Sequence, residues 1–248
     1  EKSTEKRQKL NQHFCFLLIY YVGNKLFLKR CLLCGDPLGP NGKEGICASC
    51  RRKIMPIRGN SCGKCGKPLI SEQQFCMRCR EREFYFCNNN SIFEYTGAVQ
   101  ELIKKYKFGK YRVLAAFFAK YLADFLKGIE KPFCIVPVPG NPAAIQRRGW
   151  DQVAEITKLL ITNFGFSAAD ILSRKKSRQQ KSLNFVQRSE NLKGKINVKR
   201  KKTPSSAAEI ILIDDVFTTG ATVSECARVL KEYCGEERDI RVLTIAID

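Results

Sequence analysis

One stretch of the chain constrains its fold more than any other. Between Glu209 and Leu230 the sequence reads EIILIDDVFTTGATVSECARVL, where an apolar run ends in two carboxylates and a threonine-rich loop precedes an apolar-periodic segment. An uninterrupted apolar run of this length is typical of a buried parallel strand, and apolar residues at helical spacing indicate a helix. The pattern therefore predicts a strand, Ile210–Ile213, then a loop, then a helix, Thr222–Tyr233.

The loop has the chemistry of a phosphate site. A helix start offers free N–H groups and the positive end of the helix dipole. Gly220 would let the backbone approach an anion, and the threonine hydroxyls add donors. Asp214 and Asp215 would repel a phosphate, but they suit sugar hydroxyls or a metal ion. A phosphorylated sugar would therefore suit both the loop and the two carboxylates. The simpler alternative is an ordinary capped helix start, but the whole run is more specific than that.

The run IILIDDVFTTGAT, residues 210–222, resembles the phosphoribosyl-pyrophosphate (PRPP) signature of type I phosphoribosyltransferases. The resemblance implies that Asp214 and Asp215 contact the ribose hydroxyls as catalytic residues, and that Mg²⁺ binds together with PRPP. It also implies a cradle for the 5′-phosphate, made of Thr218, Thr219, Gly220, Ala221 and Thr222.

Eight of the 13 cysteines form four C-x-x-C pairs: Cys31/Cys34, Cys47/Cys50, Cys62/Cys65 and Cys76/Cys79. Two thiolates at this spacing reach one metal ion through a tight turn, and two pairs complete the tetrahedral S₄ site of structural zinc. Pairing in sequence order makes one site from the first two pairs and another from the last two, while an interleaved arrangement stays open. Four thiolates leave no position for a substrate, so we predict structural zinc.

A disulfide framework in a secreted protein is the alternative to zinc. The apolar run Phe14–Val22 is too short to span a bilayer, and no small-residue cleavage site follows it. We therefore expect a cytoplasmic protein without a transmembrane span, in which this run forms a buried helix or strand. His13 is the only histidine, which leaves almost no material for histidine-based catalysis. Small buried hydrophobes are the expected role of Cys15, Cys87, Cys134, Cys226 and Cys234.

The charge balance points to polyanionic partners. The 248 residues include 44 basic and 24 acidic side chains, a formal net charge of +20. An excess of this size favours nucleic acid, nucleotides or acidic membrane, although a solvated basic surface would give the same balance.

The chain divides by composition into a lead segment (1–30), a cysteine module (31–87) and a larger domain (91–248), with a hinge expected at Asn88–Ser91. In the larger domain, apolar strands alternate with helical patterns. The further segments are Ile92–Tyr95, Ala98–Leu126, Phe133–Val138, Gln152–Phe164 and Val242–Ile247. This rhythm predicts an α/β fold with a mostly parallel sheet flanked by helices, and ligands bind such sheets at the carboxyl ends of the strands.

A second anion-binding region is predicted where Phe133–Trp150 reads FCIVPVPGNPAAIQRRGW. Prolines stiffen the loop after the strand, and a rigid loop with exposed N–H groups, Val138–Gly140, suits a diphosphate. The loop residues are Val138, Pro139 and Gly140. Arg147 and Arg148 can bind phosphate oxygens bidentately.

Two further basic stretches have alternative interpretations. From Arg174 to Lys202 there are twelve basic residues and one acidic residue, which predicts either a mobile segment closing over a polyanion or a solvated loop. Lys104–Arg112 interleaves lysines with aromatic residues, which either stack on bases or belong to the core of a helix.

Together these features resemble the ComF (ComFC-type) competence family, a double zinc ribbon joined to a type I phosphoribosyltransferase domain. Beyond the PRPP run and the cysteine pairs, the resemblance rests on LIKKYKFG, on PVPGNPAAIQRRGWDQVAEI and on a spaced set that implies a flexible loop: Arg174, Ser177, Gln180, Arg188 and Asn191. Asp151 stands where the family usually has Asn. The family implies a cytoplasmic role in DNA uptake during natural transformation, beside a helicase-like partner.

Two functions follow as hypotheses. The first is a phosphoribosyltransferase that uses PRPP and Mg²⁺, with the acceptor left open. The second is a non-catalytic competence factor that binds single-stranded DNA and keeps the PRPP site as a sensor or a remnant of the fold.

Overall fold

The computed structural model describes residues 29–39, 44–70, 74–175, 185–199 and 209–248. The chain forms two compact units, Glu1–Lys53 and Ile54–Asp248, which are described one at a time. The predicted buried run Phe14–Val22 lies outside the described residues. Among the described helices, none has the length and apolar character needed to cross a membrane.

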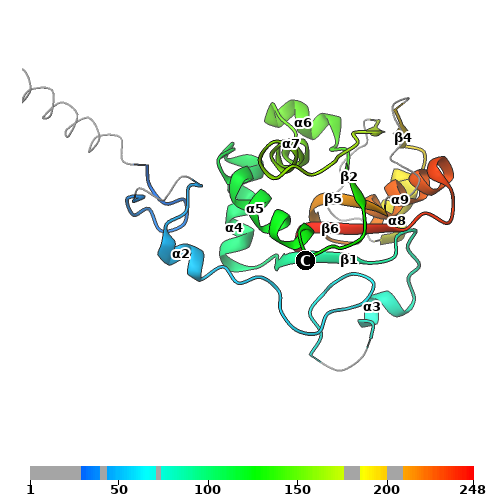
Figure 1. The fold of residues 1–248 in the computed structure, drawn as a ribbon, viewed down its shortest axis with the longest axis horizontal. Coiled ribbons are helices and arrows are strands. Elements are labelled where there is room, and N and C mark those ends of the chain that lie inside the picture. Colours follow the sequence, from blue (N-terminus) through cyan, green and yellow to red (C-terminus); the bar gives the residue numbers. More distant parts are fainter. Residues whose placement is uncertain (1–28, 40–43, 71–73, 176–184, 200–208) are drawn as a thin grey trace, which may run out of the picture. The chain divides into compact units, whose positions relative to one another are not determined.

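The larger unit is built on a four-stranded sheet in the order β1-β6-β5-β2, and all three neighbouring pairs are parallel (Figure 1). The strands are β1 Asn89–Glu94, β2 Phe133–Pro137, β5 Glu209–Phe217 and β6 Ile240–Ile247. The helices of this unit are α3 Met77–Arg80, α4 Gly97–Phe108, α5 Leu114–Leu126, α6 Pro142–Arg148, α7 Gln152–Phe164, α8 Phe185–Leu192 and α9 Ala221–Cys234. The predicted α/β class, a mostly parallel sheet flanked by helices, is confirmed.

The two faces of the sheet have separate helical covers, because alternate residues of a strand point to opposite sides. Ile210 and Leu212 of β5 belong to the apolar core that contains the buried residues of α9. Ile211 and Ile213 point the other way and are equally buried, while α5 and α7 pack against each other and against the sheet. Burial on both faces explains why β5 reads as a continuous apolar run.

The stretch Ala98–Leu126, predicted as one helical segment, is two helices. α4 ends at Phe108, and a turn through Gly109 and Lys110 separates it from α5. Lys110 has a φ of 58°, in the left-handed region, and such a residue cannot continue a right-handed helix.

The second group of cysteines is part of the larger unit. Cys62, Cys65 and Cys79 lie in the same apolar core as strand β5 and helix α9. Asn89 is buried and donates from its backbone N to the Lys64 carbonyl (2.8 Å) and from Nδ2 to the Cys65 carbonyl (2.7 Å). The expected hinge at residues 88–91 is therefore wrong, because this segment enters β1 and is hydrogen-bonded to a cysteine turn.

The rest of the described chain is short. β3 Leu172–Arg174 and β4 Ile196–Val198 form an antiparallel pair, and α8 packs on α9. The smaller unit contains α2 Ala48–Arg52. Ser177 and Gln180 of the predicted flexible loop lie outside the described residues, as does the side chain of Arg188.

Candidate functional site

A cavity of about 490 Å³ opens at the carboxyl ends of β2 and β5. Three predicted stretches meet in its wall, contributing Val138, Pro139, Gly140, Arg147, Arg148, Arg174, Asp214, Asp215 and Thr222. The wall also contains Lys107, Phe108 and Lys110 of the basic and aromatic stretch Lys104–Arg112, together with Gln152, for which no role was predicted. The cavity therefore combines two carboxylates with several cations.

Strand β5 runs past the acidic doublet. The predicted strand ended at Ile213, but pairing with β6 continues through Asp214 to Phe217. Because neighbouring strand residues alternate, the two carboxyls have different surroundings. Asp215 is 7% exposed, whereas Asp214 is only partly buried.

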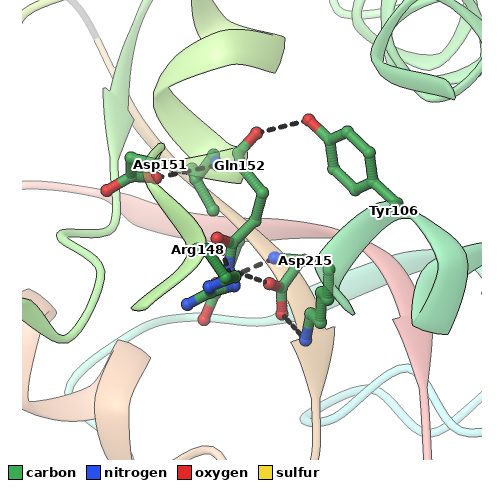
Figure 2. Close-up of polar contacts among 8 residues, drawn as sticks. Tyr106, Arg148, Asp151, Gln152 and Asp215 are labelled. Atoms are coloured by element: carbon green, nitrogen blue, oxygen red, sulfur yellow. Dashed lines mark hydrogen bonds and ion pairs between the residues drawn. The ribbon is translucent and has the colours of Figure 1, made fainter. Parts of the chain in front are cut away.

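Asp215 is held by side chains from two helices, as Figure 2 shows. Lys107 of α4 lies 2.8 Å from Oδ1, and Nε2 of Gln152 from α7 donates to Oδ2 at 2.6 Å. Gln152 in turn accepts from Nη1 of Arg148 at 2.5 Å, and its backbone carbonyl accepts from the Tyr106 hydroxyl at 2.8 Å. Asp215 is thus connected to Arg148 of α6 through the side-chain amide of Gln152.

These contacts separate the pKa values of the two carboxyls. Burial, followed by the neighbouring Asp215, raises the pKa of Asp214 to about 7, although the Asp215 N–H donates to it at 2.8 Å. Burial also acts to raise the pKa of Asp215, but the charge and hydrogen bond of Lys107 and the hydrogen bond of Gln152 outweigh it and leave that pKa lowered. At neutral pH Asp215 is an anion, and Asp214 can either donate or accept a proton.

The loop after β2 is shaped for close packing. A Cβ on Gly140 would lie 2.8 Å from Oδ2 of Asp151 and 3.0 Å from Cδ1 of Ile145, so a larger residue there would force these side-chain ends to shift. Oδ1 of Asp151 accepts from the N–H groups of Val153 (2.9 Å) and Ala154 (3.1 Å) and caps α7. Asn is an equally good cap, so the departure from the family residue at this position preserves its structural role.

The threonine–glycine loop starts α9 as predicted, with Gly220 at the cap position and a φ of 82°. Thr218 is exposed, and Oγ1 of Thr219 accepts from the N–H of Ala221 at 3.4 Å. Thr222 lines the cavity, whereas Thr218, Thr219, Gly220 and Ala221 are not part of its lining. The predicted cradle therefore lies beside the cavity and contributes one side chain to it.

Sequence reasoning missed Lys107, Gln152 and Tyr106 as neighbours of the doublet. All three stand in motifs that carry the family resemblance, KKYKFG and RRGWDQ, but the motifs do not say which partner each side chain has. Tyr106 is fully buried, as the core interpretation of the aromatic cluster predicts, whereas Phe108 is 74% exposed and its stacking on bases stays a prediction.

The eight paired cysteines gather into two groups of four, in sequence order, and within each group all sulfurs lie within 4.8 Å of one another. Cys34 and Cys47 sulfurs are 3.7 Å apart, as are those of Cys65 and Cys76. A tetrahedral site with Zn–S bonds of about 2.3 Å has sulfur–sulfur edges of about 3.8 Å, so the spacing fits zinc. The interleaved arrangement and the disulfide alternative are both wrong for the described cysteines, none of which forms a disulfide.

Comparison with known proteins supports this organisation. Residues 23–80 match the double zinc ribbon domain family. The chain is 29% identical over 216 residues to competence protein ComFC of Streptococcus pneumoniae (strain R6), covering 82% of this chain and 94% of that protein. It is 29% identical to competence protein ComFC of Bacillus subtilis (strain 168), covering 76% and 79%. The chain is a homologue of the ComFC-type competence proteins.

One further relative and one solved structure are also similar to this chain. DNA utilization protein YhgH of Escherichia coli (strain K12) is 27% identical, covering 81% of this chain and 89% of that protein. The crystal structure of a hypoxanthine phosphoribosyltransferase from Staphylococcus aureus overlaps 52% of this chain and 61% of its own at 16% identity, with a TM-score of 0.32.

The cysteine clusters of the double zinc ribbon bind zinc. Backbone N–H groups support the thiolates, since the N–H groups of Cys47 and Cys76 donate to the sulfurs of Cys31 and Cys62 at 3.4 Å. A hydrogen bond from Cys79 is the main cause that lowers the pKa of Cys65 to about 5.

The isolated cysteines follow their predicted role only in part. Cys134 and Cys226 are buried and Cys234 is partly buried, whereas Cys87 is exposed. Cys15 lies outside the described residues.

Proposed function

We propose that this chain binds PRPP together with Mg²⁺ in the cavity beside Asp214 and Asp215 and transfers its phosphoribosyl group to an acceptor. The observation that carries the proposal is the meeting of the acidic doublet with Arg147, Arg148 and the loop Val138–Gly140 in one cavity. Carboxylates suit ribose hydroxyls, and guanidinium groups suit the phosphates of the same molecule.

Each charged group has a separate part in this proposal. Arg147 and Arg148 would bind pyrophosphate oxygens, and the threonine–glycine loop would hold the 5′-phosphate. Asp214 has the more open carboxyl, so it would accept the ribose hydroxyls and supply an oxygen ligand to Mg²⁺, which prefers oxygen. When bound, Mg²⁺ would offset the charge of the leaving pyrophosphate.

Asp215 is assigned an electrostatic part. Its lowered pKa keeps it charged, and an anion held close to the sugar favours the positive charge that develops on the ribose as the bond to pyrophosphate breaks. Lys107 and Gln152 hold this carboxylate in place, and binding of a ribose hydroxyl would have to share their contacts.

We place this chemistry in DNA uptake, in the cytoplasm, with a helicase-like partner. The names of the ComFC and DNA utilization relatives support the role in DNA uptake. The basic excess of the chain favours a polyanion as part of the substrate or as a partner.

The test is calorimetry of the zinc-loaded full chain with PRPP and Mg²⁺. The double variant Asp214→Asn plus Asp215→Asn should abolish the binding heat, while Asp124→Asn, which removes an exposed carboxylate on α5, should leave it unchanged. Pyrophosphate release measured against a panel of bases and nucleic acids then tests turnover.

The competing hypothesis, a non-catalytic factor that binds single-stranded DNA, predicts another outcome. Tight, strongly salt-dependent oligonucleotide binding with no heat from PRPP would contradict the enzyme hypothesis and support the DNA-binding hypothesis.

A further inference from the structure

An exposed aromatic side chain lies in the wall of the charged cavity. Phe108, the last residue of α4, is 74% exposed and lines the same cavity as Asp214 and Asp215. Single exposed apolar residues are common on protein surfaces and by themselves indicate nothing. The position of this one, among charged groups that face a cavity, requires a reason.

Two contacts hold the last turn of α4 in place. Tyr106 is fully buried and bonded through its hydroxyl to the Gln152 carbonyl at 2.8 Å, and Lys107 is paired with Asp215. Phe108 follows directly, so its ring is carried by a helix end that cannot shift without breaking both contacts. A ring on such a support is pre-positioned for a ligand, which lowers the entropy cost of binding.

The turn after Phe108 supports the same conclusion. Lys110 has a left-handed backbone (φ 58°), a conformation that is unfavourable for a residue other than glycine, and it lines the cavity with Phe108. A strained backbone at the edge of a cavity suggests that the residue has a functional role. Phe108 and Lys110 therefore place an aromatic side chain and an ammonium group in the wall of one cavity.

We propose that Phe108 is the platform on which the planar ring of the phosphoribosyl acceptor stacks, with Lys110 binding an oxygen of the same ligand. The proposal rests on the proposed function and names its acceptor class: a nitrogen heterocycle, either a free base or an unpaired base of a single strand. An aromatic ring and an ammonium group match the ring face and the polar edge of such a ligand.

The chemistry balances without a further reactant. A ring nitrogen forms a bond to C1 of PRPP while the bond from C1 to the pyrophosphate oxygen breaks. Pyrophosphate leaves with the bonding electron pair, and the proton of the ring nitrogen passes to water.

The experiment uses the zinc-loaded full chain and two probes, a short oligothymidylate and an abasic oligonucleotide of the same length. Phe108→Leu should weaken oligothymidylate binding about ten-fold, since base–aromatic stacking contributes roughly 1–3 kcal/mol per base, and should leave abasic binding unchanged. Phe108→Trp should retain binding. Tyr111→Leu is the matched control, because Tyr111 is 45% exposed on the same turn but lies outside the cavity lining.

A second arm distinguishes the two sources of the ring. Calorimetry with free adenine in the presence of PRPP and Mg²⁺ shows binding that depends on Phe108 if the acceptor is a free base, and no such binding if it is a base of a single strand. The proposal is overturned if Phe108→Leu affects both oligonucleotides equally, or if it affects neither oligothymidylate nor adenine. If PRPP itself gives no heat, the proposed transfer fails, while the comparison of the two oligonucleotides still judges the stacking platform.

Discussion

Replacing Gly220 by alanine tests how tightly the threonine–glycine loop is packed. Gly220 begins α9 with a φ of 82°. A Cβ there would lie 2.7 Å from Cζ of Phe217 and 2.8 Å from Cε1 of Phe84, closer than real side-chain contacts allow. Gly149, at the end of α6, has the same φ of 82°, and a Cβ added to it would meet no atom within 4 Å, so it is a matched control.

The two substitutions share one cost and differ in another. A left-handed backbone costs alanine about 1 kcal/mol at either site. Only Gly220→Ala also forces two aromatic rings apart, and overpacking of a core costs about 1–3 kcal/mol. The rings have little room to yield, because Phe84 stacks on Phe86 at 4.7 Å and Phe217 meets Phe86 edge-on at 6.1 Å. We expect a loss of about 3 kcal/mol for Gly220→Ala and about 1 kcal/mol for Gly149→Ala.

Urea unfolding of the zinc-loaded full chain measures this difference in the transition of the larger unit. Because Phe84 belongs to the segment that follows the second cysteine group, the substitution should also weaken PRPP binding by displacing the loop. Equal losses of stability at the two glycines would refute the packing argument, since strain alone would then account for both.

Three other outcomes are expected. Folding raises the pKa of Asp214 from 3.8 to about 7, so the folded state keeps a proton that the unfolded chain has released, and the free energy of unfolding falls as pH rises from about 4 to 7. Asp214→Asn should remove that part of the slope. If the variant and the unsubstituted protein differ in free energy of unfolding by the same amount at about pH 4 and at about pH 7, the raised pKa is contradicted. Lys107→Met leaves the buried Asp215 without its cation and should cost about 3 kcal/mol in urea unfolding, most of it recovered when Asp215→Asn is added; no recovery would argue against an unpaired charge as the cause. Cys79→Ser, in the cluster within the larger core, should lower the Tm of the larger unit, whereas Cys34→Ser should not, and equal shifts in calorimetry would mean that both clusters support the sheet.

Local sequence patterns were sufficient for the main strands of the sheet and for several helices, but they merged α4 and α5 into one segment. The continuous apolar run of β5 indicated a buried parallel strand, and Gln152–Phe164 was predicted as a helix with the bounds that α7 has. The hinge at residues 88–91 was wrong because a polar Asn89 looks like a linker residue until its partners are known. Its side chain is buried against the Cys65 carbonyl, which no local pattern reveals.

The functional site, like the fold, could be predicted from the sequence only in part. Spacing in the chain identified the four cysteine pairs and the acidic doublet, because metal coordination and turn geometry act over a few residues. The pKa difference between Asp214 and Asp215 could not be predicted, since it depends on Lys107 and Gln152, which lie 108 and 63 residues from Asp215 in the chain.

The sequence by itself determined the α/β class, the zinc ligands and the identity of the acidic pair, because these follow from periodicity and short spacing. Only the tertiary structure decided that the second cysteine group lies in the core of the sheet, that Tyr106 is buried while Phe108 faces the cavity, and that Asp215 is the charged member of the pair. The physical reason is that burial and electrostatic environment are set by neighbours brought together from distant parts of the chain.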